Sequence, residues 1–146
     1  MLSERSVKHD IFVVERTYPA TPARVFAAWA DPNIKAHWFP KADEFDFRVG
    51  GHEFNRTPHQ GAVFTFDACY LDIIPGERIV YSYIMDRDQT RISASLTTVE
   101  FKPAGKKTRL TYTEQGVYLD GEDKPQFRLE GMNQLLDNLG KTLQAD

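Results

Sequence analysis

The spacing of apolar residues changes after Gln115, and this change divides the chain into a long strand-rich part and a helical end. Up to Gln115, apolar and polar residues alternate in many stretches, as in Glu44–Val49, and β-branched and aromatic types are common. Beyond that part, apolar residues recur at steps of three and four, which places them on one face of a helix. This stripe consists of Leu129, Met132, Leu136, Leu139 and Leu143.

Short turns rich in glycine and proline divide the first part into successive strands. Gly50-Gly51 indicates a hairpin turn, whereas Gly116–Pro125 is typical of a loop. Strands joined by short turns favour an antiparallel meander. We expect strands at His9–Tyr18, Glu44–Val49, His52–Thr57, Ala62–Ile74, Arg78–Asp86, Arg91–Lys102 and Thr108–Gln115.

Two helix starts follow the first strand in tandem. Thr21-Pro22 and Asp31-Pro32 each combine a capping side chain with a proline at the first helical position, where the missing N–H costs nothing. The first helix is expected to bury one face, and the second to continue through Ile34 to Trp38. The residues of the buried face are Val25, Phe26 and Trp29.

These elements predict an α+β fold in a single domain spanning residues 1–146. The amphipathic last helix must bury its stripe, and the sheet is its only large partner. We therefore expect a curved antiparallel sheet of about six to seven strands, with two short helices after the first strand and the long C-terminal helix in the concave face.

Composition excludes several classes of function. The net charge is −3 and the basic residues are scattered, which argues against a nucleic-acid partner. Cys69 is the only cysteine, and the histidines show no close pairing, so we expect no metal and no cofactor. No apolar run is long enough to span a membrane, and the start of the chain is polar. We expect a cytoplasmic protein without membrane insertion.

Several short motifs occur in an order that resembles one known family. They comprise Arg16, Tyr18, Val25, Phe26, Ala28, Trp29, Asp31 and Pro32, then Trp38 and Pro40, then Asp46, Phe47, Arg48, Gly50, Gly51 and Phe54, then Ile74, Pro75, Glu77, Arg78, Ile79 and Val80, then Thr108, Leu110, Thr111 and Tyr112, and finally Glu130, Gly131, Leu135 or Leu136, and Leu139. The set resembles the homologues of the activator of the heat-shock protein 90 ATPase, within the START-like (SRPBCC, helix-grip) superfamily. Met132 departs from the tryptophan that is common there.

The resemblance implies a pocket between the concave face of the sheet and the last helix. Strand parity then predicts that Phe54 points inward, so that His52 and Arg56 share its face. The alternative is that these aromatic side chains simply fill the core. The candidate ligand-binding residues are Trp38, Phe54, Phe64, Phe66, Tyr70, Tyr81, Tyr83, Met85, Tyr112, Met132 and Leu136.

Three residues are candidates for chemistry, namely Glu114, His52 and Arg56. A carboxylate on an apolar face could act as an acid or a base. The alternative places Glu114 at a strand end, in solvent or paired with Arg56 or Arg16, and is favoured because charged residues are rarely buried. His52 could carry a proton or lie at the rim of the pocket. Trp38 could gate the pocket or anchor the short helix, and its bulk favours the anchor.

Three hypotheses of function follow. The first is binding of a hydrophobic small molecule, lipid-like or aromatic and polyketide-like, without turnover; it leads because no complete catalytic set is visible. The second is a cyclase, dehydratase or hydrolase that uses the same pocket. The third is a co-chaperone-like regulator of a heat-shock protein 90 ATPase, which an exposed apolar patch outside the pocket would favour. The sequence also leaves open whether the protein forms a homodimer.

Overall fold

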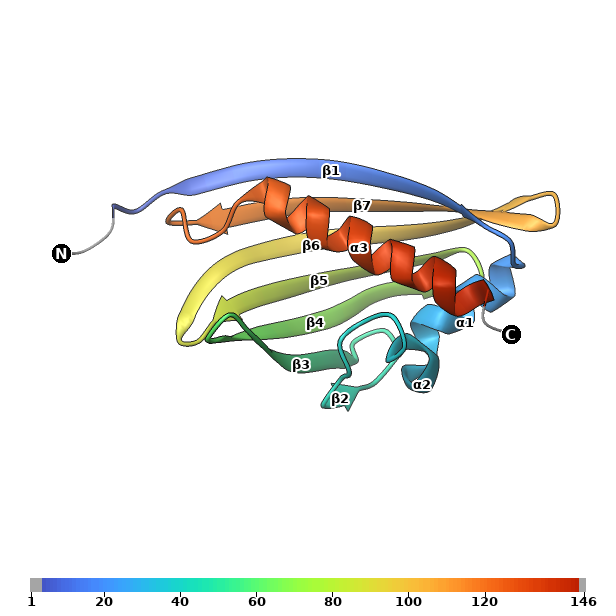
Figure 1. Ribbon diagram of the computed structural model, residues 1–146, viewed down its shortest axis with the longest axis horizontal. Helices are drawn as coiled ribbons and strands as arrows, with labels where there is room; N and C mark the ends of the chain where they lie inside the picture. The colour runs from blue at the N-terminus through green and yellow to red at the C-terminus, as the bar shows by residue number, and fades with distance from the viewer. Residues whose placement is uncertain (1–3, 145–146) are drawn as a thin grey trace.

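The computed structural model describes residues 4–144, in which one long helix crosses a seven-stranded antiparallel sheet (Figure 1). Along the sheet the strand order is β1-β7-β6-β5-β4-β3-β2. The strands are β1 (Val7–Tyr18), β2 (Glu44–Phe45), β3 (His52–His59), β4 (Ala62–Ile74), β5 (Arg78–Arg87), β6 (Thr90–Ala104) and β7 (Lys107–Leu119). The helices are α1 (Pro22–Ala30), α2 (Pro32–Lys35) and α3 (Pro125–Gln144).

The predicted helix-grip fold is confirmed. Figure 1 shows α3 crossing the curved sheet diagonally, from the end of β7 towards α1. Four residues of its stripe are buried against the sheet, with Leu136 and Leu139 fully enclosed, whereas Leu129 is half-buried. The helix lies closest to β1, where the Tyr18 hydroxyl donates a hydrogen bond of 2.7 Å to the carbonyl of Leu136. This placement leaves the half of the concave face formed by β3, β4 and β5 less covered.

Both helix caps form as the sequence predicts. The Thr21 hydroxyl accepts from the N–H of Arg24 at 3.3 Å, and the Asp31 carboxylate accepts from the N–H of Asn33 at 2.8 Å. The regular part of α2 ends at Lys35, however, and turns carry the chain on to Trp38. The buried face of α1 consists of Val25, Phe26, Ala28 and Trp29.

The prediction of a strand over Glu44–Val49 is wrong beyond Phe45. The chain turns after β2, and Phe47 packs its ring edge-on against Tyr70 with ring centroids 4.8 Å apart. Gly51 lies so close to this turn that a Cβ there would be 2.1 Å from the carbonyl oxygen of Asp46. Only glycine fits at this position, so the glycine pair marks a wide turn instead of a tight hairpin.

Strand β7 is longer than predicted and includes the first four residues of the expected loop, to Leu119. Glycine usually weakens a strand, but Gly116 allows the ring of Tyr118 to lie across its backbone, where a Cβ would be 2.9 Å from Cε2. Strand β3 likewise continues to His59 because the turn is confined to Gln60 and Gly61.

Candidate ligand-binding site

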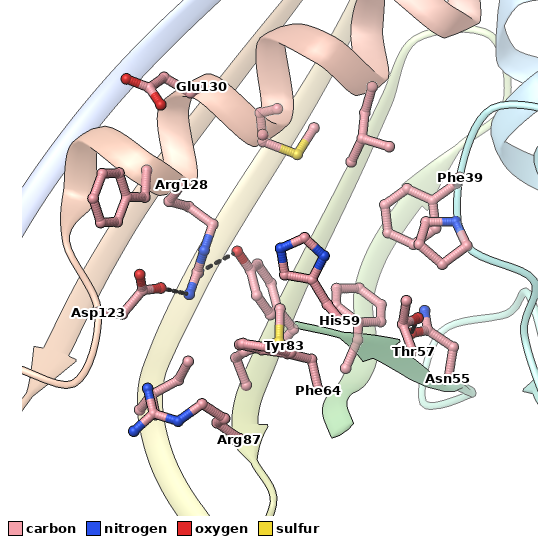
Figure 2. A pocket seen from close by; sticks show the side chains of 18 of the residues that line it. Phe39, Asn55, Thr57, His59, Phe64, Tyr83, Arg87, Asp123, Arg128 and Glu130 are labelled. Carbon is pink, nitrogen blue, oxygen red and sulfur yellow. Dashed lines mark hydrogen bonds and ion pairs between the residues drawn. The ribbon is translucent and has the colours of Figure 1, made fainter. Parts of the chain in front are cut away.

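A cavity of about 760 Å³ lies between α3 and the half of the sheet that the helix leaves less covered (Figure 2). Its floor comes from inward-facing residues of four strands, and its roof from α3. The floor residues are Phe64, Phe66, Tyr81, Tyr83, Met85, Ile92 and Tyr112. From α3 the cavity is lined by Phe127, Arg128, Glu130, Gly131, Met132, Gln134 and Leu135. The enclosed surface is therefore mainly aromatic and aliphatic.

Polar groups lie at two opposite sides of this cavity. Asn55, Thr57 and His59 of β3 form one side, and Figure 2 shows Arg87, Asp123 and Arg128 at the other. The inward direction of the β3 residues follows from the register, because Asn55 pairs with Phe66 and the latter faces the core. A ligand would thus meet an apolar middle between two polar ends.

Glu114 is fully buried behind the aromatic floor, and its carboxylate accepts hydrogen bonds from four donors. Its Oε1 accepts from the Tyr112 hydroxyl at 2.6 Å, and its Oε2 accepts from the Tyr83 hydroxyl at 2.8 Å and the Ser95 hydroxyl at 3.2 Å. Arg128 Nη1 completes the set at 3.4 Å. Glu114 is not part of the cavity wall itself, so its carboxylate holds the wall residues in place.

Arg128 connects the floor to the roof. Its Nη1 donates to the Tyr83 hydroxyl at 2.7 Å, and its Nη2 donates to Ser93 at 2.8 Å and to Asp123 at 2.9 Å. The guanidinium also lies 5.5 Å from the centroid of the Tyr83 ring. Only 9% of this side chain is exposed. Its charge is compensated on both sides by carboxylates, which a buried guanidinium requires.

A second buried ion pair lies at the β3 edge of the sheet. Lys35 Nζ is 2.7 Å from Glu53 Oε1, which also accepts from the Tyr70 hydroxyl. The ammonium lies 4.5 Å from the centroid of the Phe39 ring. This pair fixes α2, and with it Phe39 at the cavity wall, to strand β3.

All six tyrosines of the chain have a raised pKa, and burial is the largest cause in each case. The pKa values of Tyr83 and Tyr112 are raised well above the ordinary value of 10, and the negative charge of Glu114 adds to the effect of burial. The pKa of Tyr118 is raised to about 12.

The folded protein is therefore expected to show no tyrosinate absorbance near pH 10. Unfolded tyrosines ionise there, so above pH 10 the unfolded chain binds fewer protons than the folded one, and stability falls as the pH rises. An alkaline titration followed by ultraviolet absorbance and near-ultraviolet circular dichroism tests this. Absorbance should rise only near pH 12 or together with unfolding. A tyrosinate signal at pH 10 with intact near-ultraviolet dichroism contradicts the buried network.

Most of the candidate pocket residues predicted from the sequence lie in the cavity wall. Those that do are Phe64, Phe66, Tyr81, Tyr83, Met85, Tyr112 and Met132. Tyr70 and Leu136 are buried but lie outside the wall. Trp38 is also buried, and its indole N–H donates to the carbonyl of Ala28 at 2.9 Å. It anchors the segment after α2 and does not gate the cavity.

The inward direction predicted for β3 is wrong. Glu53 and Asn55 face the interior, so Phe54, His52 and Arg56 point to the outer face. There Arg56 lies 5.5 Å from the Phe54 ring and 3.5 Å from Asp43. Glu53 faces inward instead of Phe54 because Lys35 provides a buried partner for its carboxylate. His52 and Arg56 are thereby separated from the cavity.

The favoured position of Glu114, at a strand end and in solvent, is also wrong. Its ionic partner is Arg128, whereas Arg16 bonds to Asn133 and Asp137 of α3. The alternation that puts Glu114 on the same face as Tyr112 was the correct signal. Arg128 was missed, although it lies four residues before Met132 and so on the inward side of the helix.

The curved antiparallel sheet, the long helix and the cavity between them define a START-like helix-grip protein. A family model described as Activator of Hsp90 ATPase homolog 1-like protein matches residues 19–144, and the chain belongs to this family. No curated protein gave a significant match.

Solved structures agree with this assignment. Mll3558 from Rhizobium loti is 47% identical with a TM-score of 0.90, over 94% of this chain and 99% of that one. A protein from Rhizobium leguminosarum is 42% identical with a TM-score of 0.92, over 99% of this chain and all of that one. DynU16, from the dynemicin biosynthetic locus, shares the fold at 18% identity, with a TM-score of 0.71 over 93% of this chain and 48% of that one.

Two further observations concern the part of the chain that the structure describes. None of its helices is long and apolar enough to cross a membrane. Within residues 4–144, no three histidine, cysteine or acidic side chains gather as metal ligands would.

Proposed function

We propose that this protein binds a neutral, mainly apolar small molecule in the cavity between α3 and strands β3, β4 and β5. The observation that carries the proposal is the cavity itself. Its volume of about 760 Å³ lies within the range of small-molecule sites, and an apolar lining with few polar groups is typical of them.

The buried network supports binding because it fixes the wall before a ligand arrives. Tyr83 and Tyr112 are held by Glu114, and Arg128 ties α3 to the same carboxylate. Side chains that are already ordered lose little entropy when a ligand binds. The cavity therefore offers a preformed surface of tyrosine and phenylalanine rings, which favours a ring-containing ligand over a flexible chain.

The charges around the cavity disfavour an anionic ligand. Arg87 pairs with Glu122, and Arg128 pairs with Glu114 and Asp123. Each arginine already faces a carboxylate, so an anionic ligand would have to break an existing pair to be compensated. DynU16 shares the fold and comes from a biosynthetic locus, which is in keeping with a small-molecule ligand.

Binding without turnover is preferred to catalysis because the three candidate catalytic residues do not meet in the cavity. His52 and Arg56 lie on the outer face of β3. Glu114 lies behind the wall and accepts from four donors, so neither carboxylate oxygen is directed at a ligand. None of these three residues is therefore placed to transfer a proton to or from a ligand in the cavity.

The co-chaperone alternative has one observation in its favour. Val7, Ile11 and Val13 are exposed on the outer face of β1, away from the cavity. Strand β1 is also an edge of the sheet. Exposed apolar stripes of this kind mark places where another protein can bind, so a chaperone partner and a homodimer stay predictions for this strand.

Titration with N-phenyl-1-naphthylamine, a neutral fluorescent probe, tests the proposal. We expect saturable fluorescence enhancement with a Kd on the order of micromolar, as for an apolar molecule of that size in a preformed site. Gly131 lines the cavity, and a Cβ there meets nothing within 4 Å. Replacing it with tryptophan (Gly131→Trp) should therefore fill the space and weaken binding by at least about tenfold.

Gly131→Ala is the matched control for this variant. It should bind the probe as the wild type does and should raise the free energy of unfolding by about 1 kcal/mol, because alanine favours a helix over glycine. Unchanged probe affinity in a folded Gly131→Trp variant would place the binding site elsewhere. No saturable binding by the wild type would reject the proposal.

A further inference from the structure

Asn55 carries a hydrogen-bond donor that nothing in the described chain satisfies. Its side chain lines the cavity and is only 3% exposed. The amide oxygen accepts from the Thr57 hydroxyl at 3.2 Å, which orients the amide. The amide nitrogen, Nδ2, has no hydrogen-bond partner among residues 4–144. Figure 2 shows Asn55 beside Thr57 on the side of the cavity opposite Arg128.

An unpaired buried amide N–H is costly because it has lost its hydrogen bonds to water, and such groups are rare in folded proteins. In the aromatic floor, the hydroxyls of Tyr83 and Tyr112 are already bonded to Glu114. Three more unpaired buried polar atoms occur in the described chain, but their residues do not line the cavity. These atoms are Trp29 Nε1, Glu53 Oε2 and Thr97 Oγ1.

We propose that Asn55 Nδ2 donates a hydrogen bond to an oxygen of the ligand, and that Asn55 is the residue that selects it. The inference rests on the proposed binding function and narrows the ligand to a flat, neutral ring system that carries a carbonyl or ether-type acceptor oxygen. The rings lie over Phe66 and Tyr81, and the oxygen points to β3. Thr57 is a positioning residue, because its hydroxyl holds the amide oxygen away from the ligand.

Two molecules of the same shape test this selection. 9-Fluorenone and fluorene share one planar skeleton and differ only in a carbonyl in place of a methylene. Each is titrated against bound N-phenyl-1-naphthylamine, and displacement gives its affinity. We expect the wild type to prefer fluorenone by about fivefold to tenfold, the value of one net hydrogen bond.

Asn55→Leu should abolish this preference and leave both molecules within about twofold of each other, because the donor is gone while the volume is kept. Fluorene should bind the variant at least as well as it binds the wild type. Arg56→Leu is the matched control. Arg56 lies on the opposite face of the same strand, so this variant should keep the full preference for fluorenone.

Infrared spectroscopy of wild-type protein with bound fluorenone gives a second measurement that needs no variant. The carbonyl stretch should move to lower frequency than in a hydrocarbon solvent, because a donated hydrogen bond weakens the C=O bond.

Equal affinities of the wild type for fluorenone and fluorene, or an unshifted carbonyl stretch, would overturn the inference and assign Asn55 Nδ2 to water. If Asn55→Leu still prefers fluorenone to fluorene, another donor of the protein bonds to the carbonyl and the inference is wrong. Displacement of the probe by neither molecule would reject the ring-system class. All three results leave probe binding intact, whereas failure of the proposed function shows as no probe binding at all.

Discussion

Replacement of Glu114 by leucine is expected to lower the free energy of unfolding by about 3–5 kcal/mol. The change removes the carboxylate that accepts from Tyr83, Tyr112, Ser95 and Arg128. Arg128 then keeps a buried charge with only Asp123 beside it, and three hydroxyl groups lose their acceptor. Thermal or urea unfolding measures the loss, which corresponds to roughly 10 °C in Tm for a chain of this length.

Two controls separate the charge from the packing. Glu114→Gln keeps the shape and one acceptor oxygen, so its loss should be smaller. The double variant Glu114→Leu/Arg128→Met removes both charges and should recover part of the loss, since an apolar pair can replace a buried ion pair. A Glu114→Leu variant within about 1 kcal/mol of the wild type would contradict the role assigned to this network.

Replacement of Lys35 by methionine is the second change with a large expected effect, again about 3–5 kcal/mol. Glu53 is 1% exposed, and Lys35 is its only ionic partner among the described residues. Without the ammonium, the Glu53 carboxylate stays buried with the Tyr70 hydroxyl alone. We also expect weaker probe binding, because α2 holds the segment that places Phe39 in the cavity wall.

Lys41→Met gives the matched control, since Lys41 is an exposed lysine six residues further along the chain. It should change stability by no more than about 0.5 kcal/mol. The double variant Lys35→Met/Glu53→Leu should regain stability relative to Lys35→Met. Equal effects of Lys35→Met and Lys41→Met would show that the Lys35–Glu53 pair does not stabilise the fold.

The fold could be predicted from the sequence because its main signals are local. The caps at Thr21 and Asp31 depend on residues two or three positions away. The stripe on α3 needs only helical spacing and one sheet to cover it. The alternation on β4, β5 and β7 likewise gives the inward residues correctly, because each of these strands buries its aromatic face.

The polar part of the site could not be predicted, because its partners are distant in the sequence. On β3 the rule that apolar residues point inward favours Phe54, yet Glu53 and Asn55 take the inward positions. The reason is Lys35, which lies 18 residues before Glu53. Arg128 is similarly the partner of Glu114, which lies on a different element, and neither residue by itself indicates the other.

The most direct test of the cavity as a binding site uses the methionines. The chain has three, of which Met85 and Met132 line the cavity from opposite sides and Met1 lies outside the described residues. In protein labelled with ¹³C at the methionine methyl groups, bound N-phenyl-1-naphthylamine should shift both cavity signals and show nuclear Overhauser contacts to them. Saturable probe binding that leaves the Met85 and Met132 signals unmoved would contradict the account.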